Sequence, residues 1–181
     1  MKKIIENSRR IRLALQGLFY AAPIIVLHYW LVLGTPYDIY NLIELITPLD
    51  HIALLLEPIT TTTRVLAFIA SLIPTGIIIL GLHLLIRLFK SYEQGEIFTL
   101  ENSKTFRKLG FCLLYWIIAD VLYGALLSVI LSSNGNQQNR ELTLTLTAPD
   151  LLPLILAAII IVISQIMTEG QKISDEHQQT I

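Results

Sequence analysis

The sequence predicts an all-α integral membrane bundle of four transmembrane helices, formed by one domain, 1–181. Three observations predict it: four long apolar runs, a composition of 54% hydrophobic against 15% charged residues, and an uneven placement of lysine and arginine. Soluble chains carry about a quarter charged residues. A soluble domain of 181 residues with a mean hydropathy of +0.63 could not bury so much apolar surface.

The apolar runs match the thickness of a bilayer. A hydrocarbon core of about 30 Å takes about 20 residues at about 1.5 Å of rise each. Backbone polar groups inside it must pair within their own segment, so the runs are predicted to be helices. The first run is too long for a cleaved signal peptide, and we expect the fourth helix to end near Glu169. The runs are Leu13–Leu33, Val65–Ile86, Leu109–Leu131 and Leu151–Met167.

Lysine and arginine predict the orientation. Eleven of the 13 precede the first run, lie between the second and third, or follow the fourth. Because basic residues stay on the cytoplasmic side, both termini are predicted to be cytoplasmic, in a bacterial inner (plasma) membrane. On the other side, apolar 34–63 predicts one or two short helices on the bilayer surface. The alternation in Glu141–Thr147 predicts a short strand.

The inner connection carries turn and capping signals. Gly95 suits a left-handed end for the second helix, Thr99 suits the N-cap of the third, and Glu101 favours its first turn. Helices two and three should therefore extend past the bilayer and meet at a tight turn. The tail repeats the pattern, since Gly170–Glu176 can be laid over Gly95–Glu101. Two explanations of the shared pattern are open. One is convergence, and the other is duplication of a two-helix unit into tandem parallel repeats.

Those two motifs resemble the DUF2975 family of small bacterial four-helix membrane proteins. The inner turn matches a Gly-Glu-x-Phe-Thr-x-Glu-Asn pattern, and the tail matches a Glu-Gly-x-x-Leu-x-x-Glu-Gln-x-x-Thr-Val pattern except at Ile173, His177 and Ile181. The resemblance implies an inner-membrane protein of unassigned function without catalytic residues to carry over. Family members are often encoded beside a small helix-turn-helix regulator, which implies a membrane partner for such a protein. The matching residues are Gly95, Glu96, Phe98, Thr99, Glu101 and Asn102, then Glu169, Gly170, Glu176 and Thr180.

Asp120 stands at the middle of the third run, where a carboxylate costs about 2.5–3.5 kcal/mol. It is a candidate proton carrier or ion ligand. The alternative is a protonated side chain that holds helices together, with Thr75 or the Ala70 carbonyl, freed by Pro74, as its partner. A transporter or channel subunit using Asp120 would need a homo-oligomer. Asp120→Asn should then change flux or its pH dependence, and unchanged flux would exclude this function.

The sequence does not indicate a metal site, a catalytic nucleophile or a nucleic-acid-binding surface. His28 and His83 would lie roughly 8 Å outside and 11 Å inside the midplane at about 1.5 Å per residue, too far apart for one metal ion. The single cysteine, Cys112, has no nearby histidine to activate it. The net charge of -1 gives no basic footprint for nucleic acid. We therefore expect no enzyme, no metal and no cofactor.

The leading prediction is a non-enzymatic interaction protein that docks a cytoplasmic protein on its inner turn and C-terminal tail. Phe98 and Ile173 would then be apolar anchors, with Glu101 and Glu176 as polar contacts. The alternative is that Phe98 and Ile173 simply pack under the bundle. The other partner predicted for the chain is the lipid bilayer itself.

Overall fold

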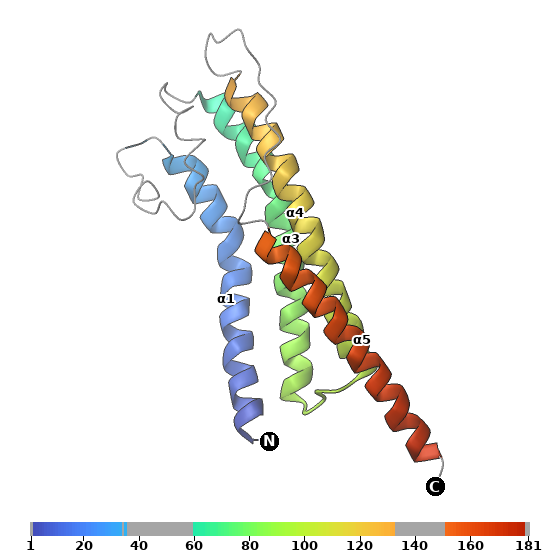
Figure 1. The fold of residues 1–181 in the computed structure, drawn as a ribbon. Coiled ribbons are helices and arrows are strands. Elements are labelled where there is room, and N and C mark those ends of the chain that lie inside the picture. Colours follow the sequence, from blue (N-terminus) through green and yellow to red (C-terminus); the bar gives the residue numbers. More distant parts are fainter. Residues whose placement is uncertain (1, 34, 36–59, 133–150, 180–181) are drawn as a thin grey trace. The chain divides into compact units, whose positions relative to one another are not determined.

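The computed structural model describes residues 2–33, 35, 60–132 and 151–179. This part of the chain forms the helices α1 (Lys2–Val32), α3 (Thr61–Glu93), α4 (Leu100–Ser132) and α5 (Leu151–Gln179), and it contains no strand (Figure 1). The all-α prediction is confirmed. The predicted strand over Glu141–Thr147 lies outside the described residues, as does nearly all of the first outer connection.

Each helix contains one of the four apolar runs, except that α1 ends one residue before Leu33, and all four are long and apolar enough to cross a membrane. α3 continues seven residues past Ile86, and α4 begins nine residues before Leu109, as expected for helices that extend beyond the hydrocarbon. Large apolar side chains such as Leu31, Ile69 and Leu122 are exposed along the runs. Hydrocarbon solvates such surfaces and water does not. The chain is a multi-pass membrane protein.

Gly170 does not end a helix, and the prediction that the fourth helix ends near Glu169 is wrong. α5 runs on to Gln179, and among the described glycines Gly95 is the one with a positive φ, of 82°. Glycine inside a helix costs only about 0.5–1 kcal/mol, and good helix formers follow Gly170. The two copies of the pattern, Gly95–Glu101 and Gly170–Glu176, therefore fold differently. Their backbones give no support to a tandem repeat.

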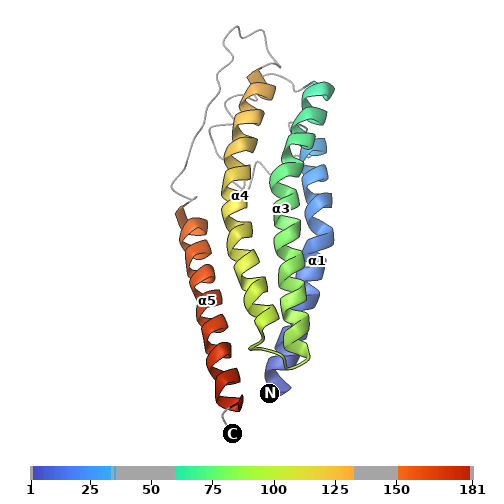
Figure 2. The same cartoon turned by 90° about the vertical axis from the view of Figure 1, so that its right-hand side faces the viewer.

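The chain divides into two compact units. The terminal unit consists of Met1–Tyr20, Ile77–Ile117 and Thr147–Ile181. Its core is the cluster of Leu84, Leu88 and Leu109, with Tyr92, Phe106 and Ile160 packed against it. Here α5 runs beside α4, and α4 beside α3 (Figure 2).

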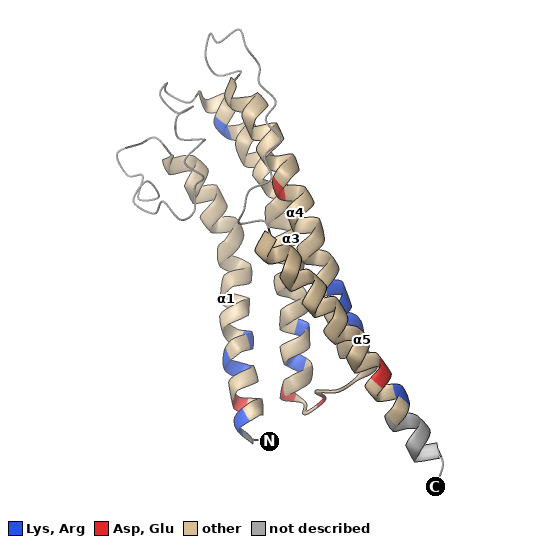
Figure 3. Cartoon of the chain, in the orientation of Figure 1, with Lys and Arg blue, Asp and Glu red and all other residues tan. Residues whose placement is uncertain are grey.

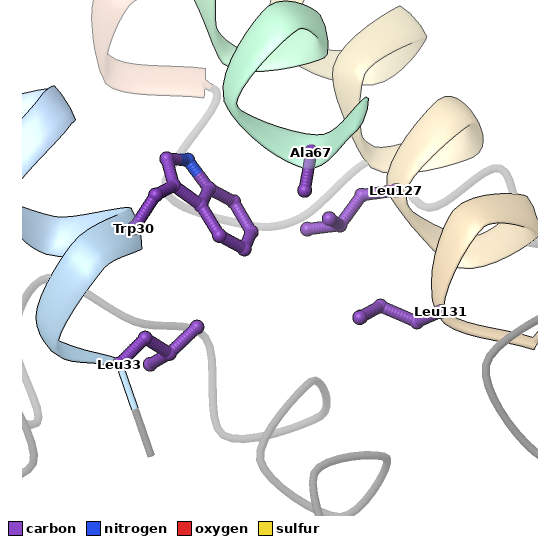
Figure 4. Close-up of a cluster of buried hydrophobic side chains, with 5 residues drawn as sticks. All are labelled: Trp30, Leu33, Ala67, Leu127 and Leu131. Atoms are coloured by element: carbon purple, nitrogen blue, oxygen red, sulfur yellow. The ribbon is translucent and has the colours of Figure 1, made fainter. Parts of the chain in front are cut away.

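The Trp30 unit consists of Ala21–Gly76 and Ile118–Leu146. Side chains from α1, α3 and α4 point toward one another in its core (Figure 4). The indole nitrogen of Trp30 donates a hydrogen bond to Ser71 Oγ at 3.2 Å. Arg64 Nη1 donates to the carbonyls of Trp30 at 3.1 Å and Leu31 at 3.0 Å. These carbonyls belong to the last turn of α1, which has no further helical amides, so Arg64 caps α1 from α3.

Replacing Arg64 with alanine should loosen the end of α1. Hydrogen bonds from a charged donor contribute about 1.5–3 kcal/mol, so we expect a loss of that order in stability and a red shift of Trp30 fluorescence. Emission is measured in detergent in a Trp116→Phe background, which leaves Trp30 as the reporter. Arg64→Lys retains the charge and one donor nitrogen, and it should shift emission less. Equal emission from Arg64→Ala and the parent protein would contradict the cap.

Candidate functional site: the α3–α4 turn and the end of α5

The turn between α3 and α4 begins with a Schellman motif at Gly95. The Glu96 amide donates to the Ser91 carbonyl at 3.2 Å, and the Gly95 amide donates to the Tyr92 carbonyl at 3.1 Å. Gly95 has the left-handed φ of 82° that this motif requires. The predicted left-handed cap is confirmed, and it satisfies carbonyls of the last turn of α3.

The turn ends at Thr99, which is the predicted N-cap of α4. The Asn102 amide donates to Thr99 Oγ1 at 3.2 Å, and the Ser103 amide donates to the Thr99 carbonyl at 3.0 Å. Asn102 then closes the turn, because its side-chain nitrogen donates to the carbonyls of Glu96 at 2.6 Å and Ile97 at 3.1 Å. The Asn102 side chain is only 3% exposed. Caps on both sides and this crosslink make the turn a well-ordered structure.

Phe98 projects from this turn with 77% of its surface exposed, and Ile173 on α5 is 54% exposed. The alternative that both pack under the bundle is therefore wrong. Seven residues of α3 separate the apolar run from the turn, a distance of about 10 Å at about 1.5 Å per residue. Phe98 thus lies beyond the hydrocarbon. The exposed large apolar residues outside the four runs, in the described part, are Ile4, Ile5, Ile11, Phe98, Leu100 and Ile173.

A hydrogen bond attaches α5 to the turn: Gln171 Nε2 donates to the Phe98 carbonyl. Ile173 follows two residues later, which is about 200° around a helix. Ile173 therefore faces away from the side of α5 that meets the turn, and Phe98 and Ile173 are two separate apolar positions. Glu176 lies on α5 as well, but its side chain is outside the described part.

Glu101 forms an ion pair with Arg87 that joins the first turn of α4 to α3. The two side chains are 68% and 56% exposed, respectively. An exposed pair of this kind contributes about 0–1 kcal/mol, so Glu101 stays accessible to another partner.

Small residues bring α4 and α5 together, a feature that was not predicted from the sequence. Ser103 Oγ donates to the Ser164 carbonyl at 2.6 Å, and both serines are fully buried. A Cβ on Gly110 would lie 2.5 Å from Ile161 Cγ1 and 3.1 Å from the Ala157 carbonyl oxygen. The available signal was a seven-residue spacing of small residues on each helix, Ser103 with Gly110 and Ala157 with Ser164. Such residues allow membrane helices to approach closely.

The start of α1 is joined to the end of α3 by another contact that the sequence did not indicate. Arg12 Nε donates to Glu93 Oε1 at 2.8 Å, and these side chains are 22% and 19% exposed. The N-terminal helix, the α3–α4 turn and the end of α5 thus share one end of the terminal unit. All described lysines and arginines except Arg64 belong to this unit (Figure 3).

Asp120 belongs to the other unit and is partly buried on α4. It interacts electrostatically with Tyr123, which also interacts with Tyr29. Thr75, its predicted partner, donates its hydroxyl hydrogen to the Ser71 carbonyl of its own helix at 2.6 Å. That proton is therefore used within α3, but the Thr75 oxygen can still accept a hydrogen bond from a protonated Asp120. Transport through Asp120 stays a prediction.

The remaining candidate groups do not form a catalytic or metal-binding cluster within the described part of the chain. Cys112 is buried, and its thiol donates to the Ile77 carbonyl at 3.3 Å. Among the described residues, no three His, Cys, Asp or Glu side chains are grouped so that they could hold a metal ion.

Comparison with known protein families gives a match. A family model described as "Protein of unknown function (DUF2975)" matches residues 53–181. The match includes α3, α4, α5 and the turn with Phe98. No curated protein and no solved structure matches the chain.

Proposed function

The chain belongs to the DUF2975 family, and from this premise we propose that it is a non-enzymatic bacterial inner-membrane protein that binds a cytoplasmic protein through its α3–α4 turn. The end of α5 would contribute a second contact. The partner class that the family resemblance suggests is a small helix-turn-helix regulator.

The cytoplasmic orientation is supported by charge. The terminal unit, which carries the turn and both chain ends, holds the described basic residues apart from Arg64. Lysine and arginine near transmembrane ends are retained on the cytoplasmic side. Under this orientation the turn faces the compartment where a regulator would be found.

Phe98 is the single observation that carries the proposal. Scattered apolar side chains are common on protein surfaces, but a fully displayed aromatic ring on a preorganised turn is typical of an interface anchor. Gly95, Thr99 and Asn102 hold the backbone around it. A partner that accepts the ring therefore has little backbone entropy to overcome.

The carboxylates around Phe98 indicate what the partner surface should contain. Glu96 and Glu101 are exposed on either side of the ring in sequence, and Glu101 has only a weak, solvated ion pair. An apolar pocket bordered by lysine or arginine would complement this arrangement. A DNA-binding regulator carries such basic residues for its own function.

Phe98→Ala should abolish co-purification of the partner. Tagged full-length protein is purified from native membranes, and bound proteins are identified by mass spectrometry. Truncating an interface anchor typically costs 2 kcal/mol or more, so we expect about a thirtyfold loss of the bound protein. The matched control is Ile4→Ala, which truncates an exposed apolar residue beyond the apolar runs on α1 and should retain the partner.

Two outcomes would count against the proposal. Equal recovery of a specific protein with Phe98→Ala and with the parent chain would show that the turn is not the docking site. A periplasmic location for a reporter fused after Ile181 would place the turn in the wrong compartment.

A further inference from the structure

A second feature of the terminal unit is a groove between α3 and α4. Its basic residues, Arg87 from α3 and Lys104 and Lys108 from α4, are all exposed. Lys104 and Lys108 are four residues apart and therefore lie on one face of α4. The full lining consists of Arg87, Leu100, Glu101, Lys104, Thr105 and Lys108.

The groove lies at the edge of the apolar stretch. Arg87 directly follows Ile86, the last residue of the second apolar run, and Lys108 directly precedes Leu109, the first residue of the third. Leu88 and Leu109, the neighbours of these two residues, belong to one buried cluster, so both helices leave the apolar stretch at the same level. Lys104 is one helical turn, about 6 Å, farther out. Lipid phosphates occupy this depth in a bilayer.

The charge of the groove is unbalanced. Three basic side chains face one carboxylate, that of Glu101, which pairs with Arg87. The neighbouring groove between α1 and α3 provides a comparison, because its Arg9 and Arg12 are matched by Glu6 and Glu93. In that groove Arg12 pairs with Glu93, while Glu6 pairs with Arg10, which is outside the lining. Of these two grooves in the described part of the chain, the α3–α4 groove therefore has the larger surplus of positive charge in its lining.

We propose that the α3–α4 groove binds the phosphate headgroup of an anionic phospholipid, with Lys104 and Lys108 as its ligands. Basic pockets between transmembrane helices select anionic headgroups by this chemistry. A lipid fits better than a dissolved anion because the cations stand where the hydrocarbon ends, so the acyl chains can lie along the exposed apolar surface of α3 and α4. Phe98 is not among the residues that line this groove.

The test compares lipid retained by the full-length protein after reconstitution and extraction. The probe is a vesicle containing equal amounts of phosphatidylglycerol and phosphatidylcholine. We expect the parent protein to retain phosphatidylglycerol in preference. Lys104→Gln/Lys108→Gln removes two cations worth about 1 kcal/mol each, so it should reduce that retention about thirtyfold. Lys3→Gln/Lys90→Gln removes the same charge from exposed positions that do not line the groove, and it should retain phosphatidylglycerol like the parent.

Three results would overturn the proposal. The parent protein could retain the two lipids equally, or the two double variants could lose equal amounts of phosphatidylglycerol. The third is displacement of phosphatidylglycerol by inorganic phosphate alone. The circular dichroism of the variants checks that the helices are intact. All four lysines are exposed, so the substitutions should leave the fold unchanged.

Discussion

Replacing Gly110 with alanine is expected to destabilise the packing of α5 against α4. The new Cβ would lie 2.5 Å from Ile161 Cγ1 and 3.1 Å from the Ala157 carbonyl oxygen. The Ile161 side chain can rotate, but the carbonyl belongs to a helix backbone and must move with α5. Overpacking of this kind costs about 1–3 kcal/mol, more than the helix propensity that alanine adds.

The matched control is Gly124→Ala on the same helix. A Cβ at Gly124 meets nothing within 4 Å, so only the propensity gain of about 0.5–1 kcal/mol should remain. Thermal unfolding in detergent measures both variants, and hydrogen exchange of α5 amides locates the change. We expect Gly110→Ala to lower the unfolding temperature and Gly124→Ala to raise it. Stabilisation by Gly110→Ala as well would mean that α4 and α5 do not approach closely at this position.

Replacing Asn102 with alanine should disorder the α3–α4 turn. The substitution removes the donor to the Glu96 and Ile97 carbonyls and leaves a small void where a 3% exposed side chain had been. Loss of a buried hydrogen-bonding group costs about 1–3 kcal/mol. Amide exchange across 95–99 should accelerate accordingly.

Glu101→Ala provides the comparison for Asn102→Ala. The two residues are adjacent, but the Glu101 ion pair is exposed and contributes about 0–1 kcal/mol. Glu101→Ala should therefore leave the exchange of 95–99 nearly unchanged. If the docking proposal is right, Asn102→Ala should also weaken partner binding, because Phe98 would lose its fixed position. Slow exchange in Asn102→Ala would show that the two caps suffice to order the turn.

Local signals predicted the α3–α4 turn well. Gly95 acts through backbone hydrogen bonds and Thr99 through its side-chain oxygen and its carbonyl. All these bonds join residues within five positions, so the effect is largely independent of the rest of the fold. The same reasoning was wrong at Gly170, where the helix continues. A glycine permits a left-handed turn but does not require one, and the surrounding residues decide between the two.

The candidate site was only partly predictable. The sequence singled out Phe98, but an aromatic residue in a turn serves equally well as a buried contact or as a displayed one. Exposure depends on whether another element covers the residue, and neither the turn nor α5 does so. The role of Asn102 could not be read from spacing alone, since its amide reaches backward to two carbonyls that only the folded turn brings near.

The sequence by itself determined the environment and the helices. A run of about 20 apolar residues must enter hydrocarbon, and there each backbone group has to pair inside its own segment, so helix formation is a local consequence of composition. Only the tertiary structure decided which faces meet: Arg12 with Glu93, Arg64 with the end of α1, and Ser103 and Gly110 with α5. Lipid solvates apolar faces as well as another helix does, so hydrophobicity cannot select the contact face. The selection rests on a few small and polar residues that match across two helices.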